Sequence, residues 1–202
     1  VAIPLGVLAA YRQGSWVDRL VMGFSVLGFS VPIFVLGYFL IFVFSVNLRW
    51  FPVQGFKKIG DGFWPFLHHL ILPSFSLGVI YIALIARMTR ASVIEVLNED
   101  YIRTAYAKGL SNMVVLMRHA LRNAAVPIVT ITGIGIGLLI GGVVVTESVY
   151  NIPGLGRLTV DAVLGRDYPT IQALILVFSC VYVVINLLID LSYTLLDPRI
   201  RY

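Results

Sequence analysis

Five apolar runs, separated by shorter polar segments, dominate the hydrophobic pattern of this chain. The runs cover residues 1–10, 20–46, 70–86, 124–145 and 170–196. A helix needs about 17–25 mostly apolar residues to cross a membrane, so only the first run is too short. The pattern predicts four complete membrane-spanning helices and one truncated helix, which starts at Val1 without a methionine and suggests a fragment. Pro32 is expected to kink the second run, because proline removes a helical hydrogen bond.

The composition indicates that the chain lies in a membrane. Hydrophobic residues make up 59% of it and charged residues only 12%, with a mean hydropathy of +0.93, whereas soluble domains are about a quarter charged. The 15 Lys and Arg residues outnumber the 10 Asp and Glu residues. In a membrane protein this surplus marks cytoplasmic loops, so it does not indicate binding to nucleic acid. The predicted fold class is all-α, a polytopic membrane protein.

The positions of the cations predict the orientation of the spans. One side of the membrane receives Arg12, Arg19, Arg87, Arg90, Arg103, Lys108, Arg118, Arg122, Arg199 and Arg201. The other side receives Arg49, Lys57, Lys58, Arg157 and Arg166. Positively charged loops stay inside the cell, so the first side is predicted to be cytoplasmic.

The sequence contains none of the common catalytic or nucleotide-binding motifs. Gly-x-x-x-x-Gly-Lys-Ser/Thr, His-Glu-x-x-His and Gly-x-Ser-x-Gly are all absent. His68 and His69 are adjacent, and adjacent residues on a helix do not face one another, so they do not predict a metal pair. We therefore predict no catalytic residue, no metal site and no cofactor held by this chain.

Glycine recurs every fourth residue in the fourth apolar run, at Gly133, Gly137 and Gly141. This spacing places the three glycines on one helix face, where another backbone can approach closely. The face is typical of helix packing, of a smooth pathway wall, or of both.

Two carboxylates lie near the ends of apolar runs. Asp190 lies about two turns before the end of the last run. A charge there is costly, which makes Asp190 a functional candidate, with pairing or snorkelling favoured over an ion site. Glu147 opens the predicted outer loop, where we expect water to hydrate it.

The polar segment between the third and fourth runs has a pattern of its own. It reads NEDYIRTAYAKGLSNMVVLMRHALRNAAVP over residues 98–127. Small residues precede Gly109, basic residues alternate with them, and a second helical run follows. A loop that only joined two spans would need no such pattern, so the segment predicts a partner.

This segment resembles the cytoplasmic EAA loop of binding-protein-dependent ABC importer permeases, most of all in the dipeptide/oligopeptide branch. Loops of that branch typically read DYIRTARAKGL and RHALRNA. The stretches ARMTRASVIEVLNEDYIRTA, NIPGLGRL and the tail DPRIRY also match, so the resemblance covers the whole chain. Arg103 replaces the initial Glu of the general motif and Arg122 follows Leu121 instead of Pro, as in the peptide branch. Tyr106 stands where Arg is common.

The resemblance implies a type I ABC importer permease-like helical bundle, with residues 1–202 as one permease domain. The branch usually has six spans, so this chain would lack the first, N-terminal span and part of the second. A cytoplasmic coupling loop, about residues 88–123, would insert a short helix into a cleft of an ATPase subunit. The coupling residues would be Arg103, Thr104, Ala105, Tyr106, Ala107, Lys108, Gly109 and Leu110. Small residues permit close approach, cations meet acidic partner residues, and Gly109 permits a turn with positive φ.

The resemblance also implies partners. These are a second homologous permease subunit, two ATPase subunits that bind ATP and Mg, and an extracytoplasmic substrate-binding protein. The chain would be a multi-pass protein surrounded by lipid in the bacterial cytoplasmic (inner) membrane. It would form half of a pathway for short peptides and would not itself be an enzyme.

One alternative from another class is a self-contained secondary transporter or channel. Such proteins place paired charges or broken helices at mid-membrane, where this sequence has almost no charge. The substrate stays open among dipeptides, oligopeptides, glutathione, nickel and sugars.

Overall fold

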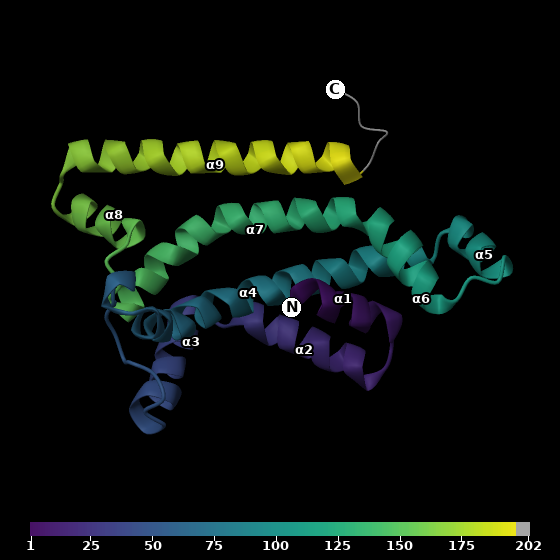
Figure 1. Ribbon diagram of the computed structural model, residues 1–202, viewed down its shortest axis with the longest axis horizontal. Coiled ribbons are helices and arrows are strands. Elements are labelled where there is room, and N and C mark those ends of the chain that lie inside the picture. The colour runs from purple at the N-terminus through teal and green to yellow at the C-terminus, as the bar shows by residue number, and fades with distance from the viewer. Residues whose placement is uncertain (197–202) are drawn as a thin grey trace. The chain divides into compact units, whose positions relative to one another are not determined.

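The computed structural model describes residues 1–196, with side chains through Tyr193 (Figure 1). The DPRIRY tail, with Arg199 and Arg201, lies outside the described residues. The regular elements of the described part are all helical, which confirms the all-α prediction. They are α1 (Ala2–Tyr11), α2 (Trp16–Ser30), α3 (Ile33–Leu40), η1 (Ile41–Asn47), η2 (Ile59–Asp61), α4 (Phe63–Leu97), α5 (Asp100–Ala107), α6 (Asn112–Val114), η3 (Val115–Ala120), α7 (Leu121–Tyr150), α8 (Leu155–Leu164) and α9 (Tyr168–Leu196).

Among the described residues, three helices are long and apolar enough to cross a membrane without a break. They cover Phe63–Leu97, Asn112–Tyr150 and Tyr168–Tyr193. The pair Trp16–Ser30 and Ile33–Asn47 passes the same test only when taken together, which gives up to four spans. The shorter apolar helix α1 has 10 residues. The described residues thus hold up to four spans, the predicted number, besides the short helix α1.

The second predicted span, residues 20–46, is not one kinked helix. α2 ends at Ser30, and a separate helix, α3, begins at Ile33 with Pro32 as its N-cap residue. Proline disfavours the helical conformation of the residue before it and has no N–H to donate. The chain therefore bends at Pro32, as predicted, but one helix ends there and another begins, instead of one kinked helix continuing.

The long helices extend beyond the predicted apolar runs. α4 has 35 residues, so at 1.5 Å per residue it is roughly 50 Å long, against about 30 Å for the hydrocarbon core. Residues 63–69, which lie between the second and third predicted runs, and residues 88–97 of the predicted coupling loop are therefore helical. The outer loop before α9 also contains a helix, α8, that the sequence analysis did not predict.

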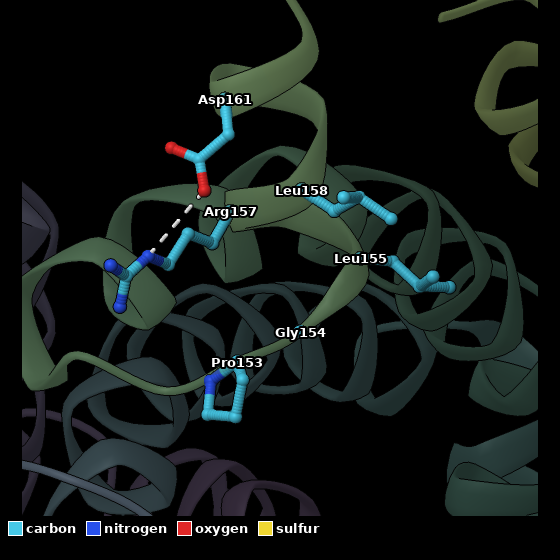
Figure 2. Close-up of a pocket in the computed structure, with 6 residues that line it drawn as sticks. All are labelled: Pro153, Gly154, Leu155, Arg157, Leu158 and Asp161. Carbon is cyan, nitrogen blue, oxygen red and sulfur yellow. Dashed lines mark ion pairs between the residues drawn. The ribbon is translucent and has the colours of Figure 1, made fainter. Parts of the chain in front are cut away.

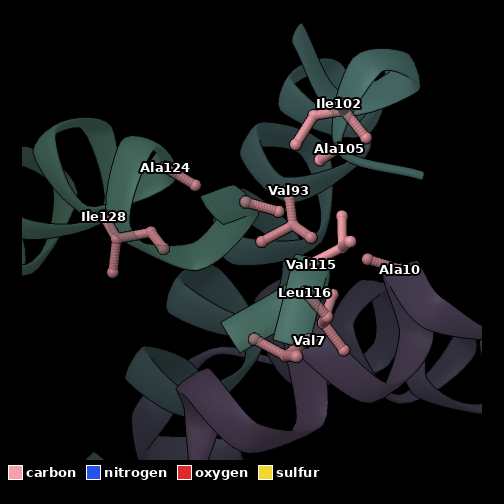
Figure 3. Close-up of a cluster of buried hydrophobic side chains, with 10 residues drawn as sticks. Val7, Ala10, Val93, Ile102, Ala105, Val115, Leu116, Ala124 and Ile128 are labelled. Atoms are coloured by element: carbon pink, nitrogen blue, oxygen red, sulfur yellow. The ribbon is translucent and has the colours of Figure 1, made fainter. Parts of the chain in front are cut away.

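The chain divides into two compact units, each described here by itself. The first comprises Val1–Phe29, Tyr81–Gly135 and the segment from Ile185 onward. Its buried apolar cluster joins Val7, Ala10, Val93, Ile102, Ala105, Val115, Leu116, Ala120, Ala124 and Ile128 (Figure 3). Val93, Ile102 and Val115 are fully buried. The cluster thus ties α1, the end of α4, α5 and the segment leading into α7 together.

The second unit comprises Ser30–Ile80 and Ile136–Val184. Its apolar cluster joins Leu40, Ile41, Leu72, Val149 and Tyr150. The buried Tyr150 hydroxyl lies 2.7 Å from Ser76 Oγ, which itself donates to the Leu72 carbonyl at 2.8 Å. Burying a hydroxyl is costly unless it is hydrogen-bonded, so these bonds compensate for its burial. They fix the last turn of α7 against α4.

Candidate functional site

The short helix α5 lies in the predicted coupling loop, between the end of α4 and α6 (Figure 1). It ends in a tight hydrogen-bonded turn. The Gly109 N–H donates to the Tyr106 carbonyl at 2.9 Å, and the Leu110 N–H donates to the Ala105 carbonyl at 3.3 Å. This pair of bonds is a Schellman motif, which requires a left-handed residue at the position of Gly109. Gly109 has φ +79°, which confirms the predicted turn with positive φ.

The helix α5 presents two different faces. Ile102 and Ala105 are buried in the apolar cluster of the first unit. Arg103, Thr104, Tyr106, Ala107, Lys108, Gly109 and Leu110 are exposed. Seven of the eight predicted coupling residues are thus available to a partner, while Ala105 points into the core of its own chain.

The side chains on the exposed face of α5 make only a few weak contacts with one another and with the helix backbone. Arg103 Nη1 lies 3.3 Å from Asp100 Oδ1, and both side chains are largely exposed, so water screens the pair. Thr104 Oγ1 donates to the Asp100 carbonyl at 3.1 Å. Lys108 is the C-cap residue of the helix, where a cation is favourable because carbonyls there carry partial negative charge.

An ion pair between a buried carboxylate and a partly exposed arginine supports the helix that leads into α5. Arg90 of α4 donates from Nε to Asp18 Oδ1 at 2.5 Å and from Nη2 to Asp18 Oδ2 at 2.8 Å. Asp18 also accepts from the Gly14 N–H at 2.9 Å. The carboxylate is thus satisfied on both oxygens, as a buried charge must be. The pair fastens the first turn of α2 to α4, and the sequence analysis counted Arg90 only as a topology signal.

The glycine face of α7 packs less uniformly than predicted. A Cβ at Gly133 would overlap the side chain of Ile189, and one at Gly137 would lie 3.0 Å from Tyr182. A Cβ at Gly141 would meet nothing within 4 Å. Gly133 and Gly137 therefore make room for side chains of α9, and no second backbone approaches them within the described part of this chain. A role in the pathway stays a prediction for all three.

The two carboxylates singled out in the sequence differ in their surroundings. Asp190 is exposed, and the structure gives it no ion pair with any described residue. Glu147 is half-buried, and its Oε2 accepts from the Arg157 N–H of α8 at 2.8 Å. The expectation that Glu147 is simply hydrated is therefore wrong. No local sequence signal pointed to this bond, because α8 itself was not predicted.

The segment around the start of α8 forms an open pocket of about 560 Å³ (Figure 2). It is lined by Pro153, Gly154, Leu155, Arg157, Leu158 and Asp161. The only charges that line it belong to Arg157 and Asp161, whose Nε and Oδ2 lie 3.8 Å apart on exposed side chains. Such a surface pair is worth little energetically. The residues that line the pocket include no catalytic arrangement.

These elements define an all-helical polytopic membrane protein with a short exposed helix between two long apolar ones. The model of the family described as "Binding-protein-dependent transport system inner membrane component" matches residues 2–202. The chain belongs to this family. Its description is that of a membrane transport component rather than an enzyme, in agreement with the absence of catalytic motifs.

Several relatives are similar over essentially the whole chain. The chain is 57% identical over 202 residues to the probable peptide ABC transporter permease protein y4tP of Sinorhizobium fredii, covering 100% of this chain and 64% of the relative. It is 51% identical over 197 residues to the glutathione transport system permease protein GsiC of Shigella flexneri, and 50% identical to that of Escherichia coli K12. Those matches cover 98% of this chain and 62% of each relative. The chain thus spans less than two thirds of the length of these relatives.

Proposed function

We propose that this chain is a permease subunit of an ATP-driven importer for short peptides. It forms half of the translocation pathway, in the bacterial cytoplasmic membrane, as a multi-pass protein. Its partners are a second homologous permease, two ATPase subunits that bind ATP and Mg, and an extracytoplasmic binding protein. The names of the relatives, a peptide permease and glutathione permeases, support peptides as the substrate class.

One observation carries the coupling part of this proposal. α5 is held to its own chain by Ile102 and Ala105, while its opposite face, including Tyr106 at 42% exposure, is uncovered. A short helix with one anchored face and one free face can transmit a push from a separate subunit. Mechanical coupling of this kind needs no catalytic group on the permease, so ATP hydrolysis takes place in the partner.

Substitution of Gly109 tests the coupling assignment. Gly109→Val forces a β-branched residue into the left-handed region, where ordinary residues lose roughly 1–2 kcal/mol. We expect the purified and reconstituted complex either to lose its ATPase subunits or to hydrolyse ATP without peptide uptake. Normal subunit retention together with normal ATP-driven uptake would falsify the coupling assignment.

Gly109→Asn is the matched control, because asparagine tolerates the left-handed conformation better than other non-glycine residues. A Cβ at Gly109 meets nothing within 4 Å in this chain, so bulk alone creates no internal clash. Retained uptake in Gly109→Asn assigns the defect of Gly109→Val to the turn conformation. Lost uptake in both variants assigns it to the surface that meets the ATPase.

The alternative of a self-contained channel or secondary transporter makes an opposite prediction. Vesicles that contain the permease pair without ATPase subunits would then accumulate peptide in response to an ion gradient. We expect no accumulation in such vesicles, and ATP-dependent uptake once the ATPase subunits and the binding protein are added.

A further inference from the structure

The start of α8 lacks a capping side chain of its own. Its N-cap residue is Gly154, and the first backbone N–H groups of a helix have no partner within the helix. Glu147, at the outer end of α7, supplies the missing acceptor, since its Oε2 accepts from the Arg157 N–H at 2.8 Å. A carboxylate at a helix N-terminus is also favoured by the partial positive charge there.

Two glycines allow α8 to approach α7 this closely. A Cβ at Gly154 would overlap the carboxylate of Glu147. A Cβ at Gly156 would lie 2.6 Å from the Cα and 2.9 Å from the N of Val144. The second overlap involves backbone atoms of α7, which cannot turn aside as a side chain can. α8 and the last turns of α7 are therefore in backbone contact.

The end of α7 holds the other outer segment of the second unit as well. The Val149 carbonyl accepts from Gln54 Nε2 at 3.1 Å, and the Tyr150 carbonyl accepts from the Gly55 N–H at 2.9 Å. The last carbonyls of a helix have no partner within it, so these bonds satisfy them. The last turns of α7 thus hold two segments in place: the segment around Gln54 and Gly55, which precedes α7 in the sequence, and α8, which follows it.

The rest of α8 offers little to hold it in place. Within the helix, only Gly156 and Ala162 are buried. Leu155, Leu158, Val163 and Leu164 are between 45% and 78% exposed. Its position is therefore set mainly by the contact with α7.

We propose that Glu147 is a positioning residue that fastens α8 to α7, so that α8 follows the outer end of α7 during the transport cycle. This inference rests on the proposed function, because it assumes a cycle driven by ATPase subunits. α7 is continuous from Leu121, where the predicted coupling loop ends, to Tyr150. A movement of α7 started at its cytoplasmic end would then reach α8 through the Glu147–Arg157 hydrogen bond and the Gly156 contact.

Two pairs of variants isolate the hydrogen bond from either side. Glu147→Ala removes the acceptor, while Glu147→Gln keeps an oxygen in its place. Arg157→Pro removes the N–H donor at the third helical position, where proline is tolerated because that N–H bonds outside the helix. Arg157→Ala keeps the N–H and removes the side chain, with its ion pair to Asp161 and its hydrogen bond to Asn151. The two partners can thus be deleted separately and together.

The readout is the movement of α8. Leu164, the last residue of α8, is 78% exposed, so Leu164→Cys in a Cys180→Ser background provides a labelling site. A membrane-impermeant maleimide is added from outside to reconstituted complexes, without nucleotide and with ATP plus vanadate. We expect the labelling rates to differ by about fivefold or more, the lower end of typical allosteric coupling.

In Glu147→Ala and in Arg157→Pro, we expect this nucleotide-dependent difference to disappear and peptide uptake to fall, while ATP hydrolysis continues. Glu147→Gln and Arg157→Ala should behave like the parent. Because both deletions break one bond, their effects should not add in the double variant. A merely structural role would lower all readouts together, through loss of assembled complex, and would leave the ratio of labelling rates unchanged.

Several results overturn the proposal. The first is a parent labelling rate that does not change with nucleotide. The second is a nucleotide-dependent difference that survives in both Glu147→Ala and Arg157→Pro. The third is a Glu147→Gln variant that loses as much of this difference as Glu147→Ala does. If Glu147→Ala fails to assemble, Arg157→Pro against Arg157→Ala still decides the question. A parent complex without ATP-driven peptide uptake would instead contradict the proposed function. Uptake is measured in the same reconstituted preparation as labelling, so the two failures can be told apart.

Discussion

The helices α5 and α8 are both short and both lie between long apolar helices, yet different contacts hold them. α5, with 8 residues, is docked by the side chains of Ile102 and Ala105 in an apolar cluster. α8, with 10 residues, touches the backbone of α7 at Gly156 and is capped by Glu147. One helix is held by side-chain packing and the other by a backbone contact with a directional hydrogen bond.

This difference bears on what each helix can do. Dispersion contacts between side chains are individually weak and change gradually with distance, so α5 can adjust when a partner presses on it. A hydrogen bond weakens steeply once its geometry is lost, and a glycine contact leaves no side chain to rearrange. α5 is therefore suited to a contact that forms and changes, and α8 to a contact that keeps its geometry.

The largest expected effect comes from removing the anchor of α5. Ile102 is fully buried, and truncating such a residue to alanine typically costs about 2–5 kcal/mol. We expect Ile102→Ala to lower the thermal unfolding temperature in detergent and to detach α5, seen as faster hydrogen exchange over residues 100–107. Tyr106→Ala is the control, because Tyr106 on the exposed face should change stability little. Equal destabilisation by the two variants would contradict the two-faced description of α5.

The next largest effect tests the ion pair between Arg90 of α4 and Asp18 of α2. Arg90→Ala leaves the Asp18 carboxylate buried without its cation, and breaking a buried pair costs about 3–5 kcal/mol. The Arg90 side chain is 24% exposed, so water will compensate part of this loss, and we expect about 2–3 kcal/mol. Arg87→Ala, an exposed position one turn earlier, is the control for loss of charge. Asp18→Asn combined with Arg90→Ala should be less harmful than the sum of the two.

A smaller effect tests the backbone contact of α8. Gly156→Ala places a methyl group against Val144, and such overpacking costs about 1–3 kcal/mol. Gly141→Ala on the same helix pair is the control, since a Cβ there meets nothing within 4 Å. We expect only Gly156→Ala to lower the unfolding temperature and to raise hydrogen exchange over residues 155–164. Indistinguishable variants would mean that α8 and α7 are not in backbone contact.

The smallest expected effect concerns the cap at the start of α9. Asp167 accepts from the Thr170 hydroxyl at 2.6 Å and from the Thr170 N–H at 3.2 Å. The hydroxyl bond first, and the backbone bond second, lower the pKa of Asp167 below its ordinary value. A lowered pKa stabilises the folded form above the unfolded pKa of about 3.9, and this contribution is lost as pH falls through the folded pKa.

The first turn of α9 should therefore fray in acid. Hydrogen exchange over residues 168–171, corrected for its intrinsic pH dependence, should rise as the pH falls below about 4. Asp167→Asn keeps an acceptor that does not titrate, so its exchange should not respond to pH in this range. A parent and variant with the same pH response would rule out Asp167 as the titrating cap.

Three residues show which structural features could be predicted from the local sequence and which could not. Gly109 was assigned a turn with positive φ from its place between two helical stretches, and its φ is +79°. Pro32 was expected to kink a helix, but the effect of proline on its own neighbours does not say whether the helix bends or ends. Ala105 was grouped with the partner-facing small residues, although it is buried. Composition identifies a small residue, but only packing shows which way it faces.

The sequence by itself determined that this chain is helical, that its helices are apolar enough for a membrane, and that a patterned polar loop separates two of them. Those properties depend on local composition and on periodicity, which are present before any folding. Only the tertiary structure decided that Arg90 pairs with Asp18, across 72 positions, and that Glu147 caps a helix to which it does not belong. Such contacts depend on which long helices lie side by side. Apolar helix surfaces offer many similar packing arrangements, so no single stretch of sequence specifies the contact.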